Sequence, residues 1–200
     1  MEMSAASRQA TYADLLAVPE HLVAEILDGE LFTSPRPVLR HSAATGSIYG
    51  DLLGLHGPPG GSDAAGGWWI LIEPELHLGA DVLVPDLAAW RVARMPSIPD
   101  EVAATLAPDW VCEVVSPSTG RLDRTRKMPL YAREGVGHLW LVDPIQRTLE
   151  VYRLEAGRWV VTAAHGGGEP VRAEPFGAVR LDPSRWWLAA SDVSAVQDRA

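Results

Sequence analysis

The chain has 200 residues, of which 47% are hydrophobic and 22% are charged, and its formal net charge is −9. This length suits one domain, and the longest apolar run (68–72) is far too short to cross a bilayer. The charge argues against a protein that coats nucleic acid non-specifically, because such coating needs a basic surface.

The chain ends and the cysteine content predict a simple layout. We expect a flexible N-terminus over 1–10, a single domain over 11–190 and a tail over 191–200. The first residues lack a basic segment followed by an apolar stretch, so no signal peptide and no membrane attachment are predicted. Cys112 is the only cysteine, which excludes an intrachain disulfide and fits a cytoplasmic protein.

The N-terminal half shows both helical and strand periodicity. Thr11 is a candidate helix cap, and Asp28-Gly29 between two apolar runs predicts a tight β-turn. The predicted elements are a helix over 12–18, a hairpin of 23–27 and 30–32, a helix over 40–55, a loop over 57–67 and strands over 68–72, 75–78 and 82–91.

The C-terminal half begins with a proline-punctuated excursion over 95–108 and then a very apolar strand. Ser116 to Thr119 supplies helix-start residues, and Gly135 ends that helix. The predicted elements are a strand over 110–115, a helix over 120–134, a strand over 138–142, a hairpin of 148–154 and 158–163, and a strand over 179–181. The fold class is therefore mixed α/β, with a sheet flanked by helices and an additional C-terminal hairpin.

Two acidic residues lie where acids are costly. Asp86 follows Pro85 in an apolar strand, and every neighbour of Glu113 is hydrophobic. A buried carboxylate costs several kcal/mol unless it is paired or binds a metal, and neighbouring strands could bring both acids to one divalent cation. The alternative is that one or both point to solvent or pair with an arginine.

The predicted helix over 120–134 follows this strand directly. Asp123, Lys127 and Tyr131 share one helical face. Five basic and two acidic residues lie between 119 and 134, so a phosphate could be attracted here. The alternative is a solvated helix face with an Asp–Lys pair.

Weaker candidates lie elsewhere. Glu25 is expected by default to be an exposed strand carboxylate, and His41 a surface residue that could also be a ligand. Glu73, Glu75 and His77 alternate along one strand, which suits a metal or a half-exposed strand equally well.

An ordered set of strings carries a family resemblance. The strings are AEILDGEL (24–31), VPDLAAW (84–90), WVCEVVSPST (110–119), RTRKMPLYAREGV (124–136) and HLWLVDP (138–144). Across 11–155 the chain resembles the Uma-two family of restriction endonucleases, a branch of the PD-(D/E)xK nuclease superfamily. The resemblance implies a restriction-endonuclease-like fold, a Mg²⁺ or Mn²⁺ site, a nucleic-acid substrate that is DNA by expectation, and a homodimer.

The resemblance also implies roles for particular residues. Asp86 and Glu113 match the two acids, with a backbone carbonyl near Val114 as a further metal ligand. The usual lysine is absent at Val115, and Lys127 on the following helix takes its place. Glu25, His41 and Tyr131 match further polar positions, Tyr131 with a structural role. Pro129 departs from a regular helix and bears on how Lys127 is aimed.

These observations lead to one hypothesis and two rivals. The first is a metal-dependent endonuclease in which Asp86 and Glu113 hold the metal and Lys127 orients or deprotonates the attacking water. The second is a catalytically weakened nucleic-acid- or protein-binding module of the same fold. The third is a metal-free structural module whose carboxylates form salt bridges.

Overall fold

The structure, a computed structural model, describes residues 8–57 and 67–187. The predicted tail over 191–200, most of the predicted loop over 57–67 and most of the predicted flexible N-terminus lie outside the described residues. No helix within the described ranges combines the length and the hydropathy needed to cross a membrane.

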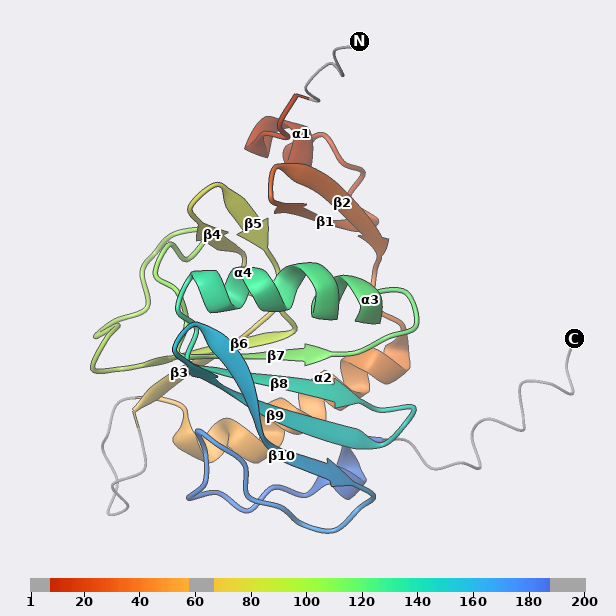
Figure 1. The fold of residues 1–200 in the computed structure, drawn as a ribbon, viewed down its shortest axis with the longest axis vertical. Helices are drawn as coiled ribbons and strands as arrows, with labels where there is room; N and C mark the ends of the chain where they lie inside the picture. The colour runs from red at the N-terminus through yellow and green to blue at the C-terminus, as the bar shows by residue number, and fades with distance from the viewer. Residues whose placement is uncertain (1–7, 58–66, 188–200) are drawn as a thin grey trace, which may run out of the picture.

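The strands of the described residues form two sheets (Figure 1). The small sheet has the order β2-β1-β5-β4. Its strands are β1 (Leu22–Leu27), β2 (Glu30–Pro35), β4 (Leu76–Leu78) and β5 (Asp81–Leu83). The large sheet has the order β10-β9-β8-β7-β6-β3 and is antiparallel except for the parallel pair β7–β8. Its strands are β3 (Trp68–Ile72), β6 (Leu87–Arg91), β7 (Trp110–Val114), β8 (His138–Asp143), β9 (Thr148–Glu155) and β10 (Arg158–Gly166).

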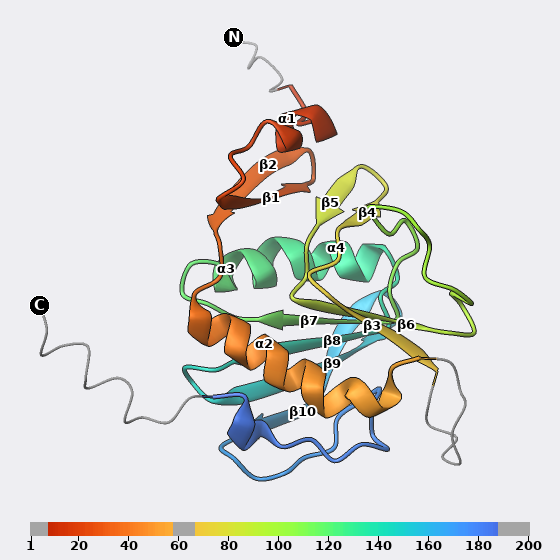
Figure 2. The same cartoon turned by 180° about the vertical axis from the view of Figure 1, so that it is seen from behind.

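The helices lie on both faces of the large sheet. Helix α2 (Leu39–Leu52), which ends in a 3-10 turn (Leu53–Leu55), runs behind the sheet in Figure 1 and in front of it in Figure 2. Helix α3 (Gly120–Leu122), a π-helical segment (Asp123–Lys127) and α4 (Met128–Arg133) form one rod on the opposite face, toward the small sheet. The remaining elements are α1 (Tyr12–Leu16) and a 3-10 turn (Pro183–Arg185).

Several local predictions are confirmed. Thr11 caps α1 through a capping box with Asp14. Asp28 and Gly29 have φ values of +51° and +78°, the left-handed pair that a tight hairpin between β1 and β2 requires. The C-terminal hairpin β9–β10 pairs over its full length with one bulge.

Three predictions are wrong. The strand expected over 82–91 is two strands in different sheets, β5 and β6, because Pro85 cannot donate to a ladder at the crossing point. No strand forms over 179–181, where Leu181 makes only an isolated bridge with Val171. Thr119 precedes the helix, but its side chain does not cap it.

The large sheet separates two apolar cores. On one face, α2 and the segment 173–187 pack over the strands, and Trp140 is fully buried there. On the other face, α4 and the small sheet cover Val111, Val115 and Leu141. Side chains alternate along a strand, so β7 sends Cys112 to the first face and Glu113 to the second.

Candidate functional site

The break between β5 and β6 forms one side of the site. Leu87 pairs with Cys112, so Asp86 stands beside the strand residues Glu113 and Val114. The Val114 N–H donates to Asp86 Oδ2 at 2.7 Å, and His41 Nε2 lies 2.5 Å from Asp86 Oδ1. The segments that carry Asp86 and Glu113 therefore lie side by side, as predicted. Asp86 stands directly before the start of β6 rather than inside a strand.

Glu113 lies at the end of β7 in a buried polar cluster. Its Oε1 accepts a hydrogen bond from the Tyr131 hydroxyl at 2.6 Å and lies 2.8 Å from Lys127 Nζ. Lys127 Nζ also lies 3.0 Å from Glu25 Oε1. The side chains of Lys127 and Glu113 are each 4% exposed, and that of Glu25 is 8% exposed. The default expectation of an exposed Glu25 is wrong, because the carboxylate turns inward to the ammonium.

The same cluster also binds the backbone at Val84, where the chain passes from β5 in the small sheet to β6 in the large sheet. The Val84 N–H donates to Glu25 Oε1 at 2.8 Å, and Lys127 Nζ donates to the Val84 carbonyl at 3.3 Å. Glu25 and Lys127 therefore position the chain two residues before Asp86. This contact joins the small sheet, the helix rod and the carboxylates into one unit.

Pro129 explains the course of the helix around Lys127. Proline has no N–H for the α-helical bond to Thr125, and the chain is π-helical over Asp123–Lys127. Pro129 then falls in the first turn of α4, where a missing N–H is tolerated. The predicted shared face is retained, since Asp123 and Lys127 are each 3% exposed and Tyr131 is fully buried.

The cluster holds more acid than base. Burial raises the pKa of Glu113 well above its ordinary value; Lys127 opposes this, and the carboxylates of Asp123, Asp86 and Glu25 add to it. Burial also raises the pKa of Asp123 to about 6, although Lys127 lowers it. Burial alone would lower the pKa of Lys127, but the surrounding carboxylates, Glu113 first, raise it well above its ordinary value.

His41 and Glu73 complete the side of the site near Asp86. Burial lowers the pKa of His41, but its hydrogen bond and charge interaction with Asp86 outweigh burial and raise it. Glu73 follows β3 with a φ of +47°, a conformation that L-residues rarely adopt. Backbone strain of this kind gathers at functional sites. The sequence pattern suggested Glu73 only as part of an alternating strand.

The basic residues of the helix rod over 120–133 were expected to attract a phosphate, but most of them form ion pairs within the protein. Arg124 pairs with Glu150, Arg126 with Glu30, and Arg133 with Asp28 and Asp81. Lys127 is buried in the cluster. Most of the helix charge is therefore neutralised by the protein itself. The alternative of a solvated face with an Asp–Lys pair is wrong as well, because Asp123 and Lys127 are both buried.

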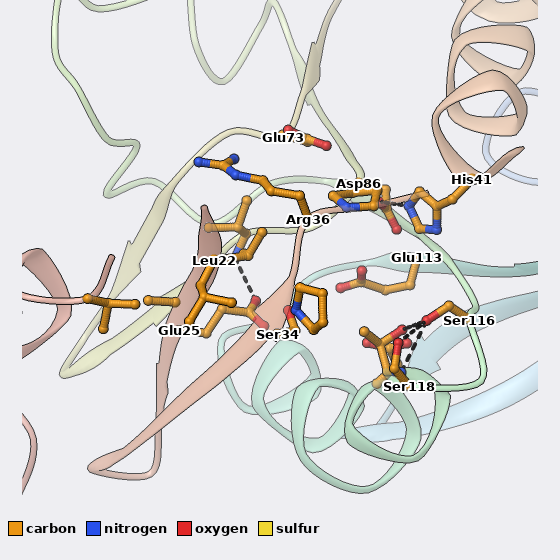
Figure 3. Close-up of a pocket in the computed structure, with 18 of the residues that line it drawn as sticks. Leu22, Glu25, Ser34, Arg36, His41, Glu73, Asp86, Glu113, Ser116 and Ser118 are labelled. Atoms are coloured by element: carbon orange, nitrogen blue, oxygen red, sulfur yellow. Dashed lines mark hydrogen bonds and ion pairs between the residues drawn. The ribbon is translucent and has the colours of Figure 1, made fainter. Parts of the chain in front are cut away.

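A pocket of about 760 Å³ opens onto the cluster (Figure 3). Seven carboxylates line it, from residues Glu20, Glu25, Glu73, Glu75, Asp86, Glu113 and Asp123. The cations that line it are Arg36 and Lys127, with His41 in addition. Arg36 was not predicted, because nothing in its local sequence distinguishes it from a surface residue. Ser116, Ser118 and Thr119 were predicted only as helix-start residues and not as part of the site.

The donor set fits a hard divalent cation. A carboxylate offers about four lone-pair sites, and Asp86 accepts only two contacts among the described residues, while Glu113 Oε2 accepts none there. No group of three or more His, Cys, Asp or Glu within the described ranges is arranged to hold a metal. Mg²⁺ commonly uses one or two carboxylates and completes its shell with water and substrate oxygens, so two acids suffice.

Comparisons with known proteins give the family and the fold of the chain. The Uma2 family, described as "Putative restriction endonuclease", matches residues 10–184. The crystal structure of "a putative nuclease belonging to DUF820 from Anabaena variabilis ATCC 29413" is similar, with a TM-score of 0.69 and 23% identity over 89% of this chain and 97% of that one. At this identity the likeness shows the mixed α/β fold. The search of curated proteins gave no match.

Proposed function

The chain belongs to the Uma2 family, and from this membership and the geometry of the site we propose that it is a metal-dependent endonuclease that hydrolyses phosphodiester bonds, with DNA as its substrate. We assign its fold to the restriction-endonuclease-like class. The observation that carries the proposal is the group of Asp86, whose side chain is 13% exposed, and the buried Glu113 and Lys127, all three in the lining of one pocket. The homodimer implied by the family resemblance is part of the same proposal.

In this proposal Asp86 and Glu113 hold Mg²⁺ or Mn²⁺. The Val114 N–H points to Asp86, and the N–H and C=O of a strand residue face the same neighbouring strand, so the Val114 carbonyl is a reasonable third ligand. When bound, the ion supplies Lewis-acid polarisation of the phosphate and a lower pKa for the attacking water.

The remaining residues act on the substrate or on the ligands. Lys127 orients the attacking water and offsets negative charge that develops on the phosphate. Tyr131 and His41 are positioning residues, because each holds one carboxylate through a short contact. Asp123 stands 4.0 Å from Lys127 and sets the position of the ammonium.

Plasmid cleavage tests the proposal. Purified protein is incubated with supercoiled plasmid in Mg²⁺, in Mn²⁺ and in EDTA, beside Glu113→Gln and Lys127→Ala. We expect nicking that requires metal and is lost in both variants. Lys127→Ala cleaving as fast as wild type would rule out the assigned role of this lysine.

A second candidate function is a binding module with a weakened site. The net charge of −9 and the existing partners of both carboxylates favour it. Calorimetry separates the two, because a vestigial site should release no heat with Mg²⁺ that depends on Asp86. The third hypothesis is a metal-free structural or oligomerisation module whose carboxylates form salt bridges, and both acids do form such contacts, with Lys127 and His41. The same calorimetry separates it from the nuclease.

A further inference from the structure

The pocket has two ends with different chemistry. One end holds the carboxylates of Asp86 and Glu113. The other is a wall of aliphatic side chains from α1 and the residues that follow it, from β1 and from the segment after β2. The wall includes Leu15, Val18, Leu22, Val23 and Val38. In Figure 3, Leu22 and Arg36 lie on one side of the pocket, and His41, Asp86 and Glu113 lie on the other. A ligand that fills the pocket must therefore place an anionic part at the carboxylate end, through the cation proposed there, and an apolar part against the aliphatic wall.

Arg36 differs from the other cations of the pocket. Lys127 is paired with Glu25 and Glu113, and His41 with Asp86. Arg36 instead donates from Nε and Nη2 to the backbone carbonyl of Glu20, at 3.3 and 2.9 Å, and forms no ion pair within the described part of the chain. Its charge is therefore available to a phosphate, and its Nη1 group is a donor still to be used.

The lining does not suit a fully paired duplex. A duplex carries one phosphate charge for about every 1.7 Å of its axis, and binding it requires many Lys or Arg contacts. Seven carboxylates and two permanently charged cations line this pocket. The Asp86 and Glu113 side chains are only 13% and 4% exposed, so the scissile phosphate must enter the pocket to reach them.

An unpaired nucleotide satisfies both constraints. Its backbone is flexible enough to bring one phosphate into a recess, and its base offers a face that apolar side chains can cover. The pocket volume of about 760 Å³ lies in the ordinary range for a bound small molecule.

We propose that this pocket takes an unpaired nucleotide, from a single strand or extruded from a duplex, with its base against the aliphatic wall at Leu22 and a neighbouring phosphate on Arg36. This inference rests on the proposed nuclease function and names its substrate class. The phosphate bound by Arg36 adjoins the scissile one, which lies at the carboxylate end.

Equilibrium binding of labelled oligonucleotides tests the inference. The full chain is titrated, in Ca²⁺ and in EDTA, with a single strand, its fully paired duplex, and the duplex carrying one bulged nucleotide. Gels check that the strands stay intact. We expect the single strand and the bulged duplex to bind about tenfold tighter than the paired duplex. Equal affinity for the paired duplex, or no binding of any strand in either condition, would overturn the proposal.

The same binding measurement on variants tests whether Arg36 and Leu22 contact the nucleotide. Arg36→Ala should weaken single-strand binding about tenfold and reduce its salt slope by about one, and Leu22→Asp should weaken it similarly. Arg158→Ala and Val160→Asp, exposed positions on β10 away from the pocket lining, serve as matched controls that should bind like wild type. Arg36 is exposed, so Arg36→Ala remains informative if Leu22→Asp does not fold. Wild-type binding by Arg36→Ala would remove the assigned phosphate contact.

Cleavage of the same oligonucleotides in Mg²⁺ separates this inference from the proposed function. A protein that prefers unpaired nucleotides in binding but cuts none of them would retain the inference and lose the nuclease. A protein that cuts paired and unpaired strands at equal rates would retain the nuclease and lose the inference.

Discussion

The two faces of strand β7 carry opposite chemistry within five residues. Trp110, Cys112 and Val114 enter an apolar core closed by α2 and by the segment 173–187. Glu113 points the other way, to Lys127 and Tyr131 on the helix rod. The first face contributes stability through packing alone, whereas the second combines the packing of Val111 with charges that are buried at a cost to stability. One strand can therefore anchor the fold and present the chemistry, and each of the following predictions tests that division.

The largest effect is expected on the apolar face. Trp140 is fully buried, packs against Trp110, Phe176 and Trp186, and donates from Nε1 to the Glu174 carbonyl at 2.6 Å. Trp140→Ala should lower the free energy of unfolding by about 5 kcal/mol, the upper end for such substitutions. Urea denaturation measures this change in the free energy of unfolding. Trp159→Ala, a partly buried tryptophan on the other face, should cost clearly less, and an equal loss would contradict the division.

Removing the buried cation should rank second. Lys127→Met leaves Glu113 and Glu25 buried without their partner, which should cost about 3 to 4 kcal/mol. The double variant Lys127→Met with Glu113→Gln should recover part of the loss, because one unpaired charge is gone. Arg121→Met, an exposed site on the same rod, should change stability by less than about 0.5 kcal/mol. A double variant no more stable than Lys127→Met would show that the two charges are not coupled.

The pH dependence of stability should reveal the excess acid. The pKa of Asp123 is raised from 3.8 to about 6 in the folded protein, so the folded state holds this proton more tightly than the unfolded state. The stabilisation that the protonated Asp123 contributes is present below pH 4 and is lost as the pH rises through 6. Asp123→Asn should then be more stable than wild type at pH 8, by roughly 2 to 3 kcal/mol, and similar to it below pH 4.

Urea denaturation at the two pH values measures this difference. The exposed Asp100→Asn is the control and should behave like wild type at both. No gain at pH 8 for Asp123→Asn would mean that the carboxylate is stabilised in its charged form.

The smallest effect should come from the hydroxyl that holds Glu113. Tyr131→Phe removes a buried hydrogen bond of 2.6 Å to a carboxylate and should cost about 1.5 to 2 kcal/mol of stability. Tyr152→Phe removes a partly exposed contact with Glu150 and should cost less. A Tyr131→Phe protein as stable as wild type would indicate that Lys127 alone satisfies Glu113.

The elements were largely predictable where short-range patterns determine them. The capping box at Thr11, the left-handed turn at Asp28-Gly29 and the apolar strand around Glu113 all depend on neighbours within a few residues. Pro85 is a sequence signal for an interruption of 82–91. That the two parts join different sheets was not predictable, because periodicity and apolar content are the same on both sides of Pro85. Only the competition between two sheets decides where the chain crosses.

The sequence by itself determined which residues are anomalous. Asp86 and Glu113 are acids in apolar surroundings, and Asp123, Lys127 and Tyr131 share a helical face because side-chain periodicity is a local property. The tertiary structure alone decided how Glu25, His41 and Arg36 contribute. They come from β1, α2 and the segment between β2 and α2. A contact between distant segments leaves no mark on the spacing of either one. The exposed or buried state of an acid such as Glu25 depends on which partner the fold brings to it, and here that partner is 102 positions away, at Lys127.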